Sequence, residues 1–192
     1  MKPVVAGRRK AGDNLTECRS MTLGLESGVV RLVPYDPAWP ALFVGEAERV
    51  QKIFSAGGLV VLLEHTGSTA IPGLAAKPIL DILAGYPEGA FVGDYVDTLT
   101  SAEYVHRGEQ GIPGREFFRR GNPRSYHLHL AAVDSAFWRD HLTFRNRLRA
   151  DESLREAYAA LKRDLAARFP RDRESYIDGK NPFVKEILGH SR

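Results

Sequence analysis

This sequence has very little cysteine and no long hydrophobic segment. Its one cysteine, Cys18, lies in a polar stretch near the N-terminus, which excludes an internal disulfide and a zinc site built from several thiolates. No apolar run approaches the roughly 20 residues that a membrane-spanning helix needs. The basic residues near the start are not followed by an apolar segment, so a secretory signal peptide is not expected. We therefore expect a cytoplasmic protein without a membrane partner.

Concentrated charge of one sign is also scarce. The chain has 27 Lys and Arg against 24 Asp and Glu, and the two kinds mostly alternate. A nucleic-acid-binding domain usually gathers its basic residues into a stripe, so nucleic acid is not the expected partner. The exception is the stretch Arg115–Arg124, where four arginines stand among Gly and Pro with one acid, Glu116. This stretch predicts a local anion-binding loop.

The length of 192 residues suits one packed domain. Residues 1–27 show no sustained periodicity, and we predict that they form a poorly ordered leader. Residues 28–192 are predicted to form a single domain. Its β-rich segments come first and its helical segments follow from about residue 136, which indicates an α+β (α/β-like) fold.

Several elements can be placed along the domain. The run Val29–Val33 is rich in β-branched residues, and Asp36 followed by Pro37 is typical of a helix start. Continuous apolar runs at Leu59–Leu63 and Pro78–Ala84 predict strands buried on both faces. Further elements are a helix at 94–101, a short strand at 104–105, a hairpin of 115–119 with 126–132, and amphipathic helices over 137–148, 154–169 and 176–188. Gly179 and Pro182 are expected to interrupt the last of these helices.

The segment Gly67-Ser68-Thr69 directly follows the first of the two buried strands. A glycine in this place lets the backbone approach a ligand closely, and free N–H groups at a helix start favour an anion. Ser68 and Thr69 would add hydroxyl donors. The segment is neither a P-loop nor a dinucleotide-binding fingerprint. The alternative interpretation is a plain strand-to-helix turn capped by Ser or Thr.

Asp81 interrupts the second apolar run. The alternation of a strand places Ile79, Asp81 and Leu83 on one face of it. A carboxylate among buried residues is costly unless it is paired, hydrogen-bonded or bound to metal. Asp81 is therefore predicted to mark the ligand-binding edge of the sheet, or else to pair with Lys77 or an arginine.

His127 and His129 share one face of the hairpin strand, since they are two residues apart. Two imidazoles at this spacing can bind a metal, bind phosphate oxygens, or act as acid and base; they can also have no such role. Glu64 and His65 precede the Gly67 loop. If the two strands are neighbours, one of these side chains could meet Asp81 at the sheet edge.

These segments resemble the GrpB family, whose fold is nucleotidyltransferase-like. The similarity runs from about residue 29 to the C-terminus. It is carried by Arg31–Pro40, by Glu64–Ile82, by His127-Leu128-His129, by Phe144-Arg145 and by Tyr158–Lys162. It implies a small mixed sheet flanked by helices, with a Gly-Ser loop that opens a helix and holds nucleotide phosphates. It also implies carboxylates in an Asp-x-Asp pattern, with a third acid on a later strand, that hold divalent metal.

The sequence departs from that pattern at two places. Asp81 matches the first carboxylate, but Leu83 occupies the position of the second. His127 and His129 stand on the later strand where the third acid is expected. The resemblance thus leaves ordinary two-metal nucleotidyl transfer in question, with a single Mg²⁺ held by Asp81 and Glu64 as the remaining arrangement.

Three functions follow from these residues. In the first, the protein is a nucleotide-dependent transferase. Gly67, Ser68, Thr69, Lys77 and Arg115 would bind the phosphates of a nucleoside triphosphate, while Asp81, His127 and His129 would serve catalysis. In the second, it is a non-catalytic nucleotide- or cofactor-binding module, in keeping with GrpB-like domains fused to dephospho-CoA kinase. The least favoured is a hydrolase whose metal is held by His127, His129 and Asp81.

Overall fold

The computed structural model describes residues 23–189. Most of the predicted leader lies outside this range. Its last residues, from Leu23 on, belong with the domain instead, because Leu25 is buried and its N–H donates to the carbonyl oxygen of Arg124 at 3.0 Å. No helix among the described residues is both long and apolar enough to cross a membrane.

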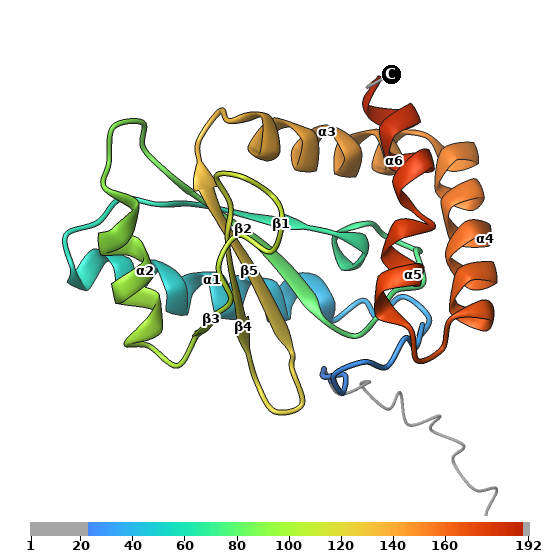
Figure 1. Ribbon diagram of the computed structural model, residues 1–192, viewed down its shortest axis with the longest axis horizontal. Helices are drawn as coiled ribbons and strands as arrows, with labels where there is room; N and C mark the ends of the chain where they lie inside the picture. The colour runs from blue at the N-terminus through green and yellow to red at the C-terminus, as the bar shows by residue number, and fades with distance from the viewer. Residues whose placement is uncertain (1–22, 190–192) are drawn as a thin grey trace, which may run out of the picture.

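One mixed five-stranded sheet forms the centre of the molecule (Figure 1). The strands lie in the order β1-β2-β5-β4-β3, in which β2 and β5 are parallel and all other neighbours are antiparallel. Their bounds are Leu62–Thr66 for β1, Leu80–Tyr86 for β2, Val105–His106 for β3, Glu116–Arg120 for β4 and Tyr126–Ala132 for β5. The expected α+β class, the hairpin of β4 and β5, and the strand around Asp81 are confirmed.

The first face of the sheet is apolar and is covered by α1 (Trp39–Ala56) and α2 (Val92–Thr100). Ile82 and Leu128, each fully buried, pack there against Val50 and Phe54 of α1. Helix α1 begins at Trp39, two residues after the start predicted at Pro37. The Asp36 side chain accepts a hydrogen bond from the Ala38 N–H at 2.8 Å, in the turn that precedes the helix.

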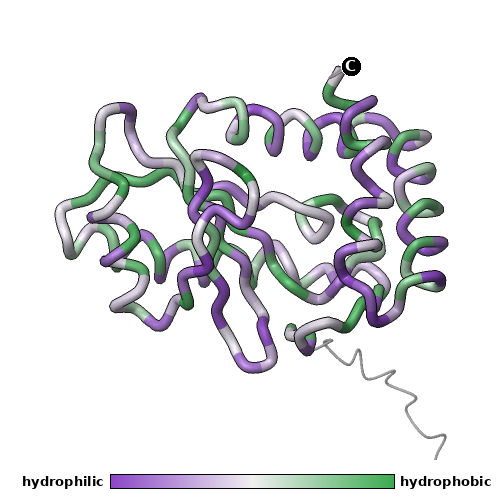
Figure 2. The backbone as a smooth tube through the Cα atoms, viewed as in Figure 1, coloured by the Kyte–Doolittle hydropathy of each residue, from purple (hydrophilic) through white to green (hydrophobic). Residues whose placement is uncertain are grey.

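The second face is covered by the C-terminal helices, α3 (Ala136–Ala150), α4 (Glu152–Arg168), α5 (Arg173–Asp178) and α6 (Asn181–Leu188). Side chains of Ser135, Asp151 and Asp172 cap the first three, as short polar residues at helix starts commonly do. The predicted interruption of the last helix is confirmed, since α5 and α6 are separate. In Figure 2, α4 alternates between hydrophobic and hydrophilic along its length, as an amphipathic helix should.

The strand predicted at 59–63, buried on both faces, is wrong in its bounds and in its burial. Strand β1 begins at Leu62 rather than at 59, and it lies at the sheet edge. Val60, which precedes β1, and Leu62, its first residue, are 65% and 53% exposed. The reason is the place of β1 at the edge of the sheet, where Arg145 of α3 bonds the Glu64 carboxylate and the His65 carbonyl oxygen and not the residues at the start of the strand. The run 29–33 likewise contributes only an isolated bridge, between Val33 and Ala76.

Candidate functional site

Asp81 lies on the second face of the sheet, near the start of the interior strand β2. The register pairs it with Thr66 of β1 on one side and with His127 of β5 on the other. Its carboxylate Oδ1 lies 3.1 Å from Nδ1 of His127 and 3.7 Å from Nε2 of His129. The predicted grouping of these three side chains on one face is therefore what the structure shows.

Gly67 lies directly over the Asp81 carboxylate. Its backbone has a φ of +68°, and a Cβ atom added there would lie 2.2 Å from Asp81 Oδ2. Both features restrict the position to glycine. The following residues Ser68–Ala70 form a single turn of 3₁₀ helix. The longer helix that the resemblance implied at this loop is thus reduced to one turn.

Asp81 and His127 form a hydrogen-bonded pair with a defined proton position. Burial alone would raise the pKa of the Asp81 carboxyl, but hydrogen bonds and charge from His127 and His129 hold it well below its usual value. Burial lowers the pKa of His127 to about 4, against the opposing effect of Asp81. A neutral His127 beside an ionised carboxylate must carry its proton on Nδ1, so Nε2 is left as an acceptor. This Nε2 has no hydrogen-bond partner among the described residues.

His129 continues the row of rings away from Asp81. Its ring lies 5.1 Å from that of Phe117 and 5.7 Å from that of His141 on α3. Burial lowers the pKa of His141 to about 4. The floor of the site at this end is therefore made of the rings of Phe117, His129 and His141.

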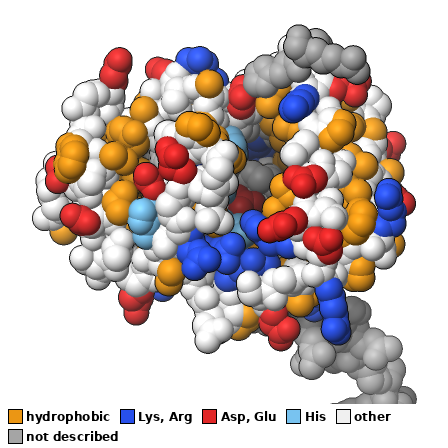
Figure 3. Space-filling model, viewed as in Figure 1, with side chains coloured by type: hydrophobic (Ala, Val, Ile, Leu, Met, Phe, Trp, Pro, Cys, Tyr) orange, Lys and Arg blue, Asp and Glu red, His pale blue; other side chains and the backbone are white. Residues whose placement is uncertain are grey.

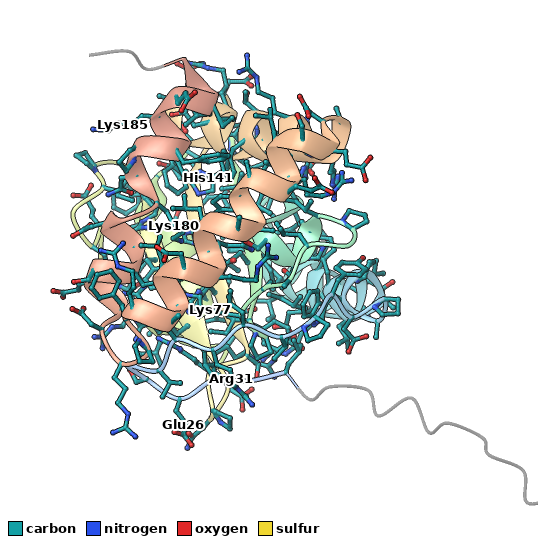
Figure 4. All side chains as sticks on the ribbon, turned by 90° about the vertical axis from the view of Figure 1, so that its right-hand side faces the viewer. Glu26, Arg31, Lys77, His141, Lys180 and Lys185 are labelled. Carbon is teal, nitrogen blue, oxygen red and sulfur yellow. The ribbon has the colours of Figure 1, made fainter. Side chains whose placement is uncertain are left out.

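Three lysines lie around Gly67 and Ser68: Lys77 from the same loop, and Lys162 and Lys180 from the C-terminal helical region. Lys162 of α4 is 1% exposed, and its Nζ donates to Ser68 Oγ at 3.0 Å and to the Ala75 carbonyl. Lys77, at the end of the loop, and Lys180, between α5 and α6, lie 5.5 and 4.8 Å from the centre of the Tyr176 ring. In the side view of Figure 4, Lys180 lies between His141 and Lys77.

These lysines repel one another. Burial, together with the charge of neighbouring cations, lowers the pKa of Lys77 and of Lys162 to about 7 and that of Lys180 to about 8. Burial contributes most in each case, and Asp81 offsets part of it for Lys77 and Lys180. An anion among the three ammonium groups would relieve both the burial and the repulsion.

The loop, the floor and the lysines enclose a cavity of about 510 Å³, called the Asp81 cavity below. Figure 3 shows the hollow with Lys and Arg side chains along its rim. Its charged and histidine lining residues are Lys77, Asp81, Arg115, His127, His129, His141, Arg173, Glu174 and Lys180. Aromatic walls are supplied by Phe117, Phe144, Tyr158 and Tyr176. Four basic residues thus face two acids, a balance that favours an anionic ligand.

The predicted phosphate-binding residues all line this cavity, but their polar groups are not equally free. Thr69 is buried, and its hydroxyl bonds His65 Nε2 at 3.0 Å. Arg115 donates to the carbonyl oxygen of Glu109 at 2.6 Å and lies over the Phe117 ring. The Lys77 side chain makes no hydrogen bond or ion pair with residues 23–189, and the Ser68 hydroxyl bonds Lys162. Lys77 and the Ser68–Lys162 pair are therefore the better-placed groups for an anion.

Glu64 and His65 do not join Asp81 in the cavity. Glu64 lies on the same face, but its carboxylate pairs with Arg145 at 2.6 Å and does not line the cavity. His65 points to the first face, where its ring stacks on Phe43 at 4.6 Å. The two side chains point to opposite faces of β1, so His65 packs against Phe43 of α1 and Glu64 pairs with Arg145 of α3.

The side chains near Asp81 do not form a magnesium site by themselves. Within residues 23–189 no group of three or more His, Cys, Asp or Glu side chains is arranged to hold a metal ion. Leu83, in the place of the second carboxylate, is fully buried. Mg²⁺ prefers oxygen ligands and commonly takes one or two carboxylates together with substrate phosphates. A magnesium ion at Asp81 would therefore depend on phosphate oxygens brought by a ligand.

Sequence reasoning missed the groups that the C-terminal helices contribute. These are Lys162, Arg173, Lys180 and His141. One signal was present for Lys162: it follows Tyr158 by four residues and precedes Leu165 by three, so a lysine stands on the apolar stripe of α4. Such a buried lysine needs a partner.

These features define an α+β domain with a basic cavity that is floored by a carboxylate and histidines. A family model described as GrpB protein matches residues 29–190. The chain belongs to the GrpB family. It is 34% identical to the UPF0157 protein YqkA of Bacillus subtilis, over 95% of this chain and 55% of that protein. It therefore spans about half the length of this relative.

A solved structure has the same fold. The crystal structure of the conserved protein GrpB from Enterococcus faecalis is 33% identical, covers 83% of this chain and 96% of its own, and has a TM-score of 0.73. A more distant relative, named dephospho-CoA kinase, comes from Mycolicibacterium paratuberculosis. It is 30% identical over 82% of this chain, which spans 44% of that protein.

Proposed function

We propose that this protein binds a small phosphorylated molecule in the Asp81 cavity, with a nucleoside triphosphate as the first candidate. The observation that carries the proposal is the gathering of Lys77, Lys162 and Lys180 around Ser68. These three come from a loop and two separate helical segments, so their proximity is a product of the fold. Phosphate oxygens supply the charge that the cluster lacks.

The size and walls of the cavity fit a ligand larger than phosphate. Its volume of about 510 Å³ falls within the range of roughly 300–1,000 Å³ that small-molecule sites occupy. Tyr158 and Tyr176 offer aromatic surface beside the lysines. This combination of a cationic corner and aromatic walls suits a phosphorylated molecule with a ring system, such as a nucleotide.

A titration calorimetry experiment tests the binding. We expect ATP to bind, and Lys180→Met to weaken binding by roughly tenfold or more, as the loss of a charge-assisted hydrogen bond implies. Lys185→Met is the matched control, because Lys185 is exposed in the next helix and does not line the cavity. Equal loss in both variants, or no binding of any nucleoside triphosphate to folded protein with or without Mg²⁺, would refute the nucleotide proposal.

Group transfer on the bound ligand is a second candidate, and the Asp81–His127 pair favours it. The carboxylate orients His127 so that Nε2 is the free acceptor, the arrangement by which an imidazole accepts a proton from an attacking hydroxyl. Asp81→Asn should then abolish turnover of the nucleotide with a small acceptor while ATP still binds. The relative named dephospho-CoA kinase supports the competing idea of a binding module for a phosphorylated cofactor. Ligand binding without turnover in the wild type would decide for that module.

A further inference from the structure

A second group of cations lies beside the Asp81 cavity, and the function proposed above does not use it. Arg119 on β4, Arg124 after the hairpin turn and Arg173 at the start of α5 form this group, called the arginine cluster below. Arg119 pairs in register with His127 and so lies on the same face of the sheet as Asp81. Arg119 and Arg124 line a separate groove of about 390 Å³.

Arg173 links the groove to the cavity. It lines the Asp81 cavity, and its charge acts on both Arg119 and Arg124. Burial, and after it the positive charge of Arg173, lower the pKa of the Arg119 guanidinium. Burial and the charges of Arg119 and Arg173 lower the pKa of Arg124 to about 10. Asp81 offsets only part of the effect on Arg124. Arg173 therefore lies close enough to Arg119 and Arg124 for its charge to act on both.

The guanidinium groups of this cluster are poorly partnered. None of the three has an ion pair with an acid in the part of the chain that the structure describes. Buried Nε atoms of all three, and Nη1 of Arg124, lack a hydrogen-bond partner there. Arg124 is 6% exposed, and its Nη2 donates to the Glu26 carbonyl oxygen at 3.2 Å. Buried donors of this kind are normally satisfied.

The nearby acids that the structure describes do not pair with the arginine cluster. The groove contains Glu26 and Glu103. The Glu103 carboxylate is held by Arg49 at 3.1 Å and lies 3.8 Å from Arg120. The cavity side offers Glu174 and Asp81, and the latter is committed to His127. Fixed arginines with unfilled donors are the usual receptor for a phosphate group.

We propose that the arginine cluster is a second phosphate site, and that the natural ligand carries two separated phosphate groups. This inference rests on the proposed function. One phosphate would lie among Lys77, Lys180 and Ser68, and the other would reach Arg119 and Arg124 past Arg173. The ligand class is a nucleotide that is phosphorylated at both ends of its sugar.

A matched pair of probes tests this inference: adenosine 5′-monophosphate and adenosine 3′,5′-bisphosphate, which differ by one phosphate. We expect the full chain to bind the bisphosphate at least roughly tenfold more tightly, the effect of one charge-assisted contact. Arg119→Gln should remove that advantage and leave the affinity for the monophosphate unchanged. Arg171→Gln is the control, since Arg171 is an exposed arginine two residues before α5 that lines neither hollow. Circular dichroism and thermal unfolding would establish that each variant is folded.

The outcomes separate the two proposals. Equal affinity for both nucleotides in the wild type, or an advantage that survives Arg119→Gln, overturns the second site and leaves the phosphorylated-ligand proposal in place. Absence of binding for both nucleotides, and for ATP, overturns both. If single-stranded oligonucleotides bind more tightly with length, with a steep salt dependence lost in Arg119→Gln, the arginines serve nucleic acid and the small-ligand inference is wrong.

Discussion

The two faces of the central sheet differ in what their side chains do. On the first face, Ile82, Leu128 and Leu130 are fully buried against α1 and α2. On the second face, the neighbouring positions are Asp81, His127 and His129, and they floor a cavity. The same two strands supply both sets, because alternate residues of a strand point in opposite directions. The first face thus supplies apolar burial, and the second holds charges that the fold must support.

This contrast predicts that changes on the two faces have separable consequences. Removal of an apolar side chain from the first face should lower stability and spare the affinity of the folded protein for anions. Changes around Asp81 should act on affinity more than on stability.

Leu128→Ala should have the largest effect. Leu128 is fully buried on the first face, and the loss of a core leucine typically lowers the free energy of unfolding by about 2–5 kcal/mol. Urea unfolding measures this change. Leu62→Ala, at a 53% exposed position, is the control and should cost far less. A loss of ATP affinity in folded Leu128→Ala as large as in Lys180→Met would break the separation of the two faces.

Gly67→Ala should affect both properties. The new Cβ would overlap Asp81 Oδ2 at 2.2 Å, at a φ of +68°, so the loop must shift away from the carboxylate. We expect a loss of stability of about 1–3 kcal/mol and a larger proportional loss of ATP affinity. Gly73→Ala is a matched control, since its φ is +77° with nothing within 4 Å of the added atom. Gly73→Ala should show the effect of backbone strain alone. Equal results for the two variants would contradict the close approach of Gly67 to the Asp81 carboxylate.

The lysine cluster should couple pH to stability and to binding in opposite directions. A lysine in an unfolded chain has a pKa of about 10.4, whereas Lys77 and Lys162 have about 7 and Lys180 about 8 in the folded protein. Between these values the unfolded chain binds more protons, so the contribution of these groups to stability increases as pH rises from about 7 to 10. Phosphate binding needs the ammonium form and should weaken over the same rise.

The measurement is the difference between wild type and Lys180→Met in unfolding free energy and in ATP affinity, taken from pH 6 to 9. Lys180→Met should be the more stable protein at low pH and the wild type should bind ATP more tightly. Both differences should shrink as pH rises, because the wild-type ammonium is lost. Lys185→Met should give flat differences in both. A stability difference that grows with pH would show that Lys180 is not electrostatically destabilised in the fold.

Much of the fold could be predicted from local patterns. The β4–β5 hairpin, the strand around Asp81 and the break at Gly179 each follow from residues close together in the chain, through strand alternation and turn chemistry. The edge position of β1 could not be predicted in this way. An apolar run such as 59–63 indicates a strand, but whether helices cover both of its faces depends on where α1 and α3 lie.

The candidate site likewise has features that local patterns predict and features that depend on distant elements. That Asp81, His127 and His129 can share a face, and that a glycine precedes Ser68, follows from the two-residue period of a strand and the order of the chain. The packing of distant elements sets the other contacts: Lys162 bonds Ser68, 94 residues away, Lys180 and Arg173 line the cavity, and Glu64 pairs with Arg145. The physical reason is that the charge and pKa of a buried group depend on which distant groups the packing brings within a few ångströms, and no local period encodes that.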